Sequence, residues 1–280
     1  MPLPPLPQAL ALIQEYLDHY NHVMPIFHPP TIVTLLGQQY SDNSRNLSNN
    51  SAWWISLNVM LALAQRRRVE LKHYAAGNME MVWGYVQNAM DVLLDVTLRC
   101  TSLCSIQALL VLALFFLGTP DSQMSFSLTG CAVRNSEMIG LNIAITHPNF
   151  TLEQIIQRKR VFWVTAILEQ AASHRAGRPA TLALQDREID IPPEIDYERI
   201  GIVTSSDGSS KTNLFRMMAH IATIESKTFQ KLYSSSKSGR TGDEINNIIR
   251  DLDKDLKAYK KSIPASFNVD NFGSEDWFKP

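Results

Sequence analysis

Apolar residues recur at the three- and four-residue spacing of amphipathic helices along most of the chain, and no convincing series of alternating apolar and polar positions interrupts them. The first stripe consists of Leu10, Ile13, Leu17 and Tyr20. The same periodicity predicts further helices over residues 53–65, 79–94, 102–117, 123–140, 151–176 and 213–233. The pattern therefore predicts an all-α fold, an irregular multi-helix bundle of antiparallel helix pairs.

Local signals mark the ends of two of these helices. Thr151 with Gln154, and Thr241 with Glu244, have the spacing of a capping box, in which the two side chains satisfy free N–H groups of the first turn. Gly177 is expected to end the helix that the first box opens, because glycine readily adopts the left-handed C-terminal conformation. The second box opens a helix with an apolar stripe at Ile245, Ile248, Leu252, Leu256 and Tyr259.

The order of apolar and polar segments indicates one folding unit. Residues 102–117 are apolar nearly all round, which is typical of a helix in the middle of a bundle. Residues 41–51 and 204–210 are polar and are interpreted as linkers inside that unit. The length by itself allows one or two domains, and we expect residues 1–280 to form a single helical domain. The longest apolar run, residues 108–117, is too short to span a membrane, so no membrane partner is expected.

Charge and cysteine content restrict the class of protein. The 26 Lys and Arg residues nearly balance the 27 Asp and Glu residues, which argues against a whole-chain binder of nucleic acid or anionic lipid. The basic runs at residues 66–68 and 158–160 are expected to face water, with the stem of Arg160 tucked against the aromatic residues that follow it. Cys100, Cys104 and Cys131 are interpreted as buried thiols of a soluble intracellular protein.

The sequence lacks the common catalytic motifs, and two clusters of polar residues are the remaining candidates for a reactive site. No dinucleotide-binding, phosphate-binding, nucleophile-elbow or zinc-protease motif occurs. A helical enzyme could use the histidines His19, His22 and His28 or the carboxylates Asp186, Glu188 and Asp190. We interpret the histidines as a polar helix face and the carboxylates as surface partners of Arg178 and Arg187.

Several short segments, taken in order, resemble one known family. They read Arg-Val-Phe-Trp at residues 160–163, Ile-Leu-Glu at 167–169, Ser-His-Arg-Ala-Gly-Arg-Pro at 173–179 and Asp-Arg-Glu-Ile-Asp-Ile-Pro-Pro at 186–193. Further matching segments lie at residues 20–28, 105–110, 128–134, 139–141, 221–233 and 256–264. Together they resemble the fungal-specific transcription factor domain, the middle homology regulatory region of fungal zinc-cluster transcription factors. The resemblance covers about residues 10–267.

The chain departs from this family in a few places. Asn142 stands where a His is common, and Glu169 stands where an Asp is usual. The family's six-cysteine cluster, which binds two zinc ions, cannot be built from three cysteines, so no cofactor is expected in this chain. The family's helical region often continues further, so the domain is expected to be incomplete at its C-terminal end. The chain is then a fragment, a truncated product or a relative without the DNA-binding module.

The resemblance implies an all-helical regulatory domain that acts in the nucleus, in regulation of RNA polymerase II transcription. Its conformation would respond to a small-molecule inducer, to a co-regulator or to the transcription machinery; DNA would be reached only through the missing module, and a homodimer is left open. The alternatives are a DNA-free adaptor or scaffold and, less favoured, the helical enzyme. Candidate pocket-edge or buried residues are Arg134, Arg160, Trp163 and Arg178, and simple helix-end or carboxylate pairing is the competing interpretation of the arginines.

Overall fold

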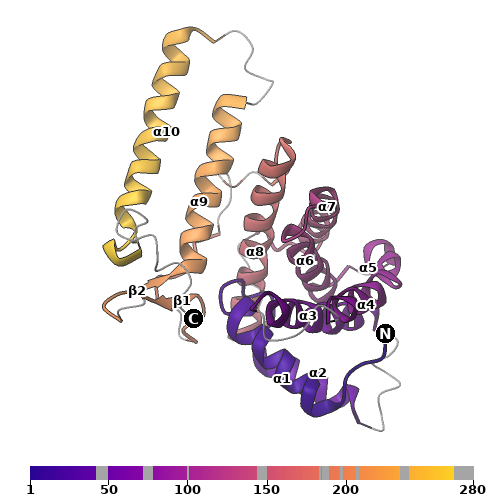
Figure 1. Ribbon diagram of the computed structural model, residues 1–280. Coiled ribbons are helices and arrows are strands. Elements are labelled where there is room, and N and C mark those ends of the chain that lie inside the picture. Colours follow the sequence, from indigo (N-terminus) through magenta and orange to yellow (C-terminus); the bar gives the residue numbers. More distant parts are fainter. Residues whose placement is uncertain are drawn as a thin grey trace.

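A chain of helices makes up the protein, as Figure 1 shows. The computed structural model describes residues 1–41, 50–71, 78–99, 101–143, 150–182, 184, 189–195, 198–205, 208–233 and 240–267. The first half contains α1 (Leu6–Tyr16), the π-helical turn η1 (Leu17–Asn21), α2 (Pro29–Gln39), α3 (Ser51–Glu70), α4 (Asn78–Met90), α5 (Leu93–Arg99) and α6 (Leu103–Leu117). The second half contains α7 (Ser122–Met138), α8 (Leu152–Ala176), β1 (Ile202–Thr204), β2 (Lys211–Asn213), α9 (Leu214–Thr228), the π-helical turn η3 (Phe229–Tyr233), α10 (Gly242–Ser262) and a 3₁₀ turn (Ala265–Phe267). The predicted all-α class is confirmed.

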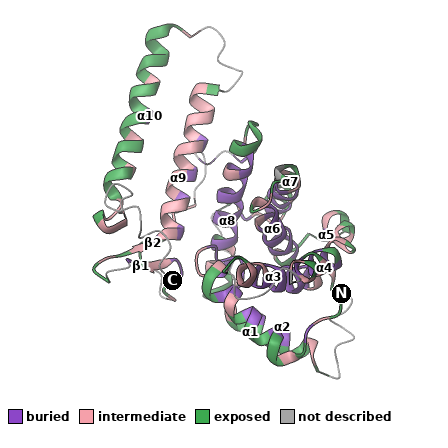
Figure 2. Ribbon diagram, in the orientation of Figure 1, coloured by how far each residue is buried: buried purple, intermediate pink, exposed green. Residues whose placement is uncertain are grey.

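Two helices, α3 and α6, form the centre of the bundle. Every residue from Ile55 to Gln65 in α3 and from Ser105 to Ala113 in α6 is buried (Figure 2). The two helices pack on each other, α4 covers α3, and α7 packs on both α6 and α8. The apolar character of residues 102–117 thus predicted a central helix correctly, because such a helix has no face left for water.

The helix ends follow the capping signals. Thr151 and Thr241 each accept a bond from the third backbone N–H of their helix, and Gln154 and Glu244 each accept the N–H of the capping threonine in return. Gly177 ends α8 with φ 62° and ψ 32°, the left-handed conformation that was predicted. The helix predicted over residues 79–94 is instead divided into α4 and α5. Both capping boxes and the glycine stop are therefore confirmed.

The basic run at residues 66–68 was expected to face water, and this was wrong. Arg66 Nη1 donates to the carbonyl of Phe115 at 3.0 Å, and its guanidinium lies 4.8 Å from the centre of the Phe115 ring. Arg68 forms a two-pronged ion pair with Glu15. These arginines therefore join α3 to α6 and to α1.

The expectation of buried thiols was also wrong for Cys104, which is exposed in the first turn of α6 and precedes its buried stretch. Cys131 is half-buried, and Cys100 lies outside the described residues.

The polar stretch at residues 204–210 connects the two strands of a small hairpin and is not a plain linker between helices. Strands β1 and β2 pair antiparallel, with Ile202 opposite Asn213 and Thr204 opposite Lys211. The hairpin is tied to the N-terminal part of the chain, since the N–H of Gly201 donates to the carbonyl of His22 at 2.7 Å and His22 Nε2 bonds the carbonyl of Ile202 at 2.8 Å. Strands of three residues are too short to show a period-two pattern, which explains why sequence periodicity did not reveal them.

The last helices project from the bundle. One hydrophobic cluster of buried residues extends from α1 to α9, and α9 packs on α8. Helix α10 runs antiparallel to α9 and packs on it (Figure 1), and of its predicted stripe only Leu252 is buried, outside that cluster. Ile245 and Leu256 remain 40% and 48% exposed. Within the described ranges, none of the helices is both long and apolar enough to cross a membrane. That residues 1–280 form one domain stays a prediction.

Replacement of Gly201 by alanine tests the hairpin junction. Gly201 has φ +80°, and an added Cβ would lie 2.5 Å from Asn213 Oδ1 and 2.9 Å from Phe215 Cβ. We expect Gly201→Ala to lower the free energy of unfolding by about 3 kcal/mol, because steric overlap adds to the backbone strain. Gly208→Ala is the matched control, since its φ is +72° with open space around it, and it should cost about 1 kcal/mol. Urea unfolding measures both losses. Equal losses would contradict the close contact of Gly201 with Asn213 and Phe215.

Candidate functional site

Helix α8 is the element that organises the candidate site. It packs on α6, α7 and α9, and most of its length is buried. Its polar side chains bind two other parts of the chain: the proline link, residues 22–28 between η1 and α2, and the return segment, residues 178–200 that lead from α8 to the hairpin. Of the return segment, residues 178–182, 184, 189–195 and 198–200 are described. Helix α8 therefore acts as a strut between early and late segments.

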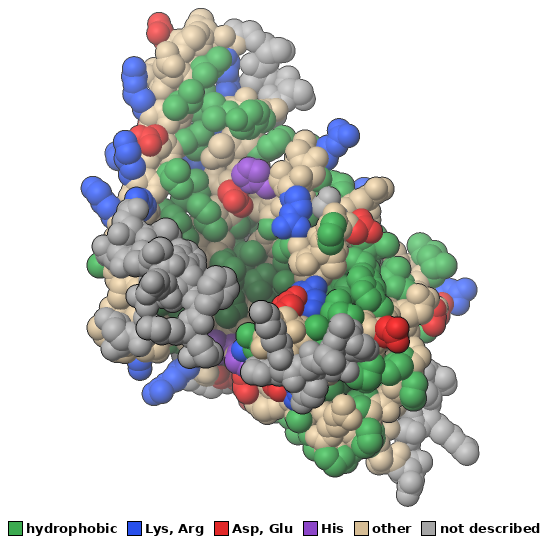
Figure 3. All heavy atoms as spheres, in the orientation of Figure 1, with side chains coloured by type: hydrophobic (Ala, Val, Ile, Leu, Met, Phe, Trp, Pro, Cys, Tyr) green, Lys and Arg blue, Asp and Glu red, His purple; other side chains and the backbone are tan. Residues whose placement is uncertain are grey.

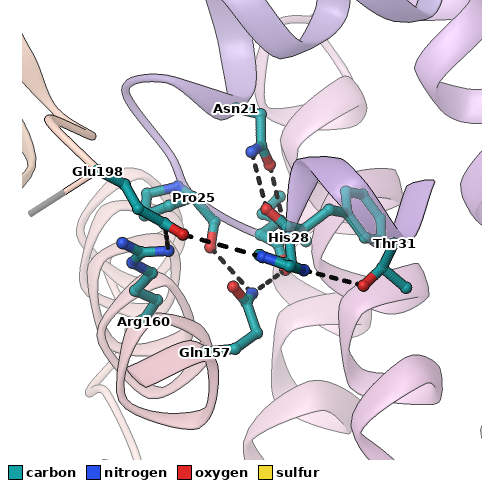
Figure 4. Close-up of polar contacts among 9 residues, drawn as sticks. Asn21, Pro25, His28, Thr31, Gln157, Arg160 and Glu198 are labelled. Carbon is teal, nitrogen blue, oxygen red and sulfur yellow. Dashed lines mark hydrogen bonds and ion pairs between the residues drawn. The ribbon is translucent and has the colours of Figure 1, made fainter. Parts of the chain in front are cut away.

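An ion pair at the middle of α8 joins these segments (Figure 4). Arg160 is only 5% exposed, and its Nη1 donates to Glu198 Oε2 at 2.6 Å. The other carboxylate oxygen of Glu198 lies 3.8 Å from His28 Nε2, and His28 Nδ1 bonds Thr31 Oγ1 at 2.9 Å. Glu198 thus connects α8 with the start of α2. The expectation that the run at residues 158–160 faces water was wrong for Arg160, and also for Arg158, which donates to the carbonyl of Ile139 at 2.7 Å.

Amide side chains hold the proline link against the bundle. Gln157 Nε2 donates to the carbonyls of Ile26 at 2.8 Å and Pro25 at 3.4 Å, as Figure 4 shows. Gln107 of α6 donates to the same Ile26 carbonyl at 2.5 Å. Asn21 exchanges two bonds of 2.8 Å with the backbone of Phe27. These bonds satisfy backbone groups that proline and burial leave without partners, so the link has one fixed path.

Two further side chains of α8 bind the return segment. Trp163 Nε1 donates to the carbonyl of Asp190 at 2.9 Å. The carboxylate of Glu169 accepts the backbone N–H groups of Thr181 at 2.6 Å and Leu182 at 3.0 Å. Burial raises the pKa of Glu169, although these bonds act in the opposite direction. Glu169 was not selected from the sequence as a site residue; the signal was a glutamate directly after the apolar residues 166–168, on a helix that is mostly buried.

The four candidate residues do not form one site. Arg160 and Trp163 lie one turn apart on α8 and hold the return segment. Arg178 is exposed just beyond the end of α8, where it lines the groove described below. Arg134 is exposed on α7 and does not belong to the groove lining. Arg160 is therefore a buried cation, Arg178 lies at a pocket edge, and Arg134 is neither.

The histidine and carboxylate clusters do not assemble into a reactive centre within the described residues. His19 is exposed, His22 bonds a backbone carbonyl, and His28 lies between Glu198 and Thr31. Asp186 and Glu188 lie outside the described residues. No group of three or more His, Cys, Asp or Glu side chains that could hold a metal ion occurs in the part of the chain that the structure describes.

A groove of about 680 Å³ lies between α8, α9 and α10. Figure 3 shows the hollow, with hydrophobic side chains gathered along its floor and walls. Most of its lining is apolar: Ala180, Ile221, Ile224, Phe229, Leu232, Tyr233, Ile249, Leu252 and Leu256. Its polar part includes Glu225, which lies 3.6 Å from His174 Nδ1 and whose pKa is raised by burial, and Ser173, which is 3% exposed. The groove thus combines an apolar surface with a few fixed polar groups.

Removal of Glu198 tests whether the ion pair at α8 holds the fold. We expect Glu198→Ala to lower the free energy of unfolding by about 2 kcal/mol, because it leaves the charge of Arg160 buried without its carboxylate. The estimate is below the usual cost of breaking a buried pair, since the Glu198 side chain is 23% exposed. The control is Asp95→Ala, which breaks the exposed pair with Arg99 and should cost about 0.5 kcal/mol or less. If Glu198→Ala lowers the free energy of unfolding as little as Asp95→Ala does, the ion pair of Arg160 has no structural role.

The raised pKa of Glu169 predicts a pH dependence of stability. A carboxyl group that binds its proton more tightly in the folded chain stabilises the fold fully below its unfolded pKa, near 4.3. That contribution is lost as the pH rises through the higher folded pKa. The wild type should therefore lose unfolding free energy relative to Glu169→Gln as the pH rises above this range. A difference that does not change with pH would contradict a raised pKa of the Glu169 carboxyl group.

Comparison with known proteins identifies the family. The family model "Fungal specific transcription factor domain" matches residues 13–261. The chain is 40% identical over 270 residues to an "ABC-transporter-regulating transcription factor" of Aspergillus fumigatus, a match that covers 96% of the chain and 30% of that protein. It is 36% identical over 253 residues to the "Fusaridione A cluster transcription factor" of Fusarium heterosporum, covering 90% of the chain and 48% of that protein. The chain thus spans less than half the length of these relatives, and no solved structure matches it. The chain belongs to the fungal specific transcription factor domain family.

Proposed function

We propose that this chain is the regulatory domain of a fungal transcription regulator, acting in the nucleus on RNA polymerase II transcription and not as an enzyme. The observation that carries the proposal is the family match over residues 13–261, together with relatives that are named transcription factors. These relatives are named for different targets, a transporter class in one case and a metabolite cluster in the other. The proposal therefore concerns the control of transcription and assigns no target gene.

The arrangement around α8 supports control by conformation. Glu198, Trp163 and Glu169 connect α8 to the return segment, which leads directly into the hairpin and α9. A ligand or a co-regulator protein that binds α9 or α10 would change the balance between two arrangements of these helices if it binds one of them more tightly. DNA contact would come from a separate zinc-cluster module, since three cysteines supply too few thiolates for six-cysteine coordination.

A reporter experiment tests this function. The chain is inserted between a heterologous zinc-cluster DNA-binding module and an activation domain, and the control fusion carries an unstructured linker of equal length. We expect the inserted chain to change reporter expression at least several-fold relative to the linker. Glu198→Ala should abolish this difference, because it removes the ion pair between α8 and the return segment. Equal expression from the chain and the linker, with the chain folded by circular dichroism, would refute the proposal and favour a DNA-free adaptor.

Elemental analysis gives an independent check on the cofactor expectation. We expect the purified chain to carry no stoichiometric zinc, because its cysteines cannot form the family's two-zinc cluster and no metal-ligand cluster occurs among the described residues. About two zinc ions per chain would overturn this expectation.

A further inference from the structure

We propose that the groove between α8, α9 and α10 binds an apolar small molecule that carries a basic nitrogen, with Glu225 as its counter-ion. The proposal deepens the proposed function by naming the chemical class of the inducer, and its regulatory consequence rests on that function. The binding itself is a property of the folded chain and can be tested without transcription.

The size and lining of the groove fit a small-molecule site. Its volume of about 680 Å³ falls within the range of roughly 300–1,000 Å³ that is typical of such sites. Ile221, Ile224 and Phe229 of α9 and η3 line the groove together with Ile249 and Leu256 of α10. Leu256 and Ile249 are 48% and 47% exposed, so they have apolar surface still to bury. An apolar ligand would remove this surface from water, which is the main favourable term for binding.

Glu225 supplies the charge that selects a cation. It is the more buried of the two lining carboxylates: its side chain is 31% exposed, compared with 52% for Asp253, which is paired with Lys257. Its partner His174 is 74% exposed and lies 3.6 Å away, so solvent weakens the attraction between them. Burial raises the pKa of Glu225 despite that partner. A protonated nitrogen in the groove would stabilise the carboxylate at close range.

Ser173 gives a second, independent indication of a ligand. It lines the groove and is 3% exposed, and its hydroxyl has no hydrogen-bond partner among the described residues. Buried polar groups in folded proteins are nearly always hydrogen-bonded, so such a hydroxyl needs a partner. A polar atom of a bound molecule would supply one on the α8 side, opposite the apolar side chains of α10.

The position of the groove explains how such a ligand would act. Helix α10 packs on α9, to which it is tied by the ion pair of Lys227 with Asp255, whereas the ligand would also contact Ser173 and Gln170 of α8. Filling the groove would therefore add contacts between α8 and the α9–α10 pair in the arrangement described here. A ligand with these contacts binds this arrangement more tightly than one in which the helices separate.

Three naphthalene compounds with the same skeleton test the proposal. 4-(1-Naphthyl)butylamine, the corresponding alcohol and the corresponding carboxylic acid are titrated into the purified chain, and naphthalene fluorescence reports binding. We expect saturable binding of the amine, weaker binding of the alcohol and the weakest binding of the acid. Glu225→Gln should weaken the amine about tenfold and change the alcohol less than about twofold. The matched control Asp243→Asn, an exposed carboxylate in the first turn of α10, should leave all three unchanged.

A groove variant checks the location, and the possible results separate the two proposals. Leu256→Gln, at a half-exposed position that tolerates a polar side chain, should weaken the amine and the alcohol alike. The site is refuted if the amine does not bind saturably, if it binds no better than the alcohol or acid, or if Glu225→Gln weakens all three equally. If the amine does not bind but the inserted chain still changes reporter expression relative to the linker, only the ligand site is refuted. If the amine binds but the inserted chain does not change reporter expression, the proposed function is refuted instead.

Discussion

The hydrogen-bond demand of buried backbone is the constraint on which this fold depends. Long, irregular segments such as the proline link and the return segment lie against the apolar bundle, where unsatisfied N–H and C=O groups cost free energy. Gln157, Trp163 and Glu169 of α8 meet that demand with side-chain bonds to Ile26, Asp190 and Leu182. One helix therefore fixes the path of the proline link and of the described parts of the return segment.

The same helix connects the two ends of the candidate site. Arg160 and Ser173 are 13 positions apart on α8, which is about 20 Å along the axis at the usual helical rise. The ion pair to Glu198 lies at one position and the groove lining at the other. Helix α9 packs on α8 and contributes to the common hydrophobic cluster, whereas α10 is held mainly through α9. A ligand in the groove would contact α8 and the α9–α10 pair together, so its binding would change how these helices are held against one another.

Sequence patterns predicted those parts of the structure in which local chemistry decides the outcome. The capping boxes at Thr151 and Thr241, the glycine stop at Gly177 and the buried helix α6 follow from residues within one or two turns of each other. The roles of Arg66, Arg160 and Glu169 could not be predicted, because their partners Phe115, Glu198 and Leu182 come from other segments of the chain. A basic run gives no indication of which arginine turns inward. Family resemblance identified the region around α8, whereas only the structure shows which backbone groups it holds.

The bonds between His22 and the hairpin also have a consequence during synthesis. His22 Nε2 bonds the carbonyl of Ile202, a partner that lies 180 residues later in the chain. At translation rates of about 5–20 residues per second, that partner leaves the ribosome roughly 10–40 s after His22. Until then the hydrogen bonds that His22 makes with Gly201 and Ile202 cannot form. The contact between the N-terminal segment and the hairpin is therefore made only after most of the chain has been synthesised.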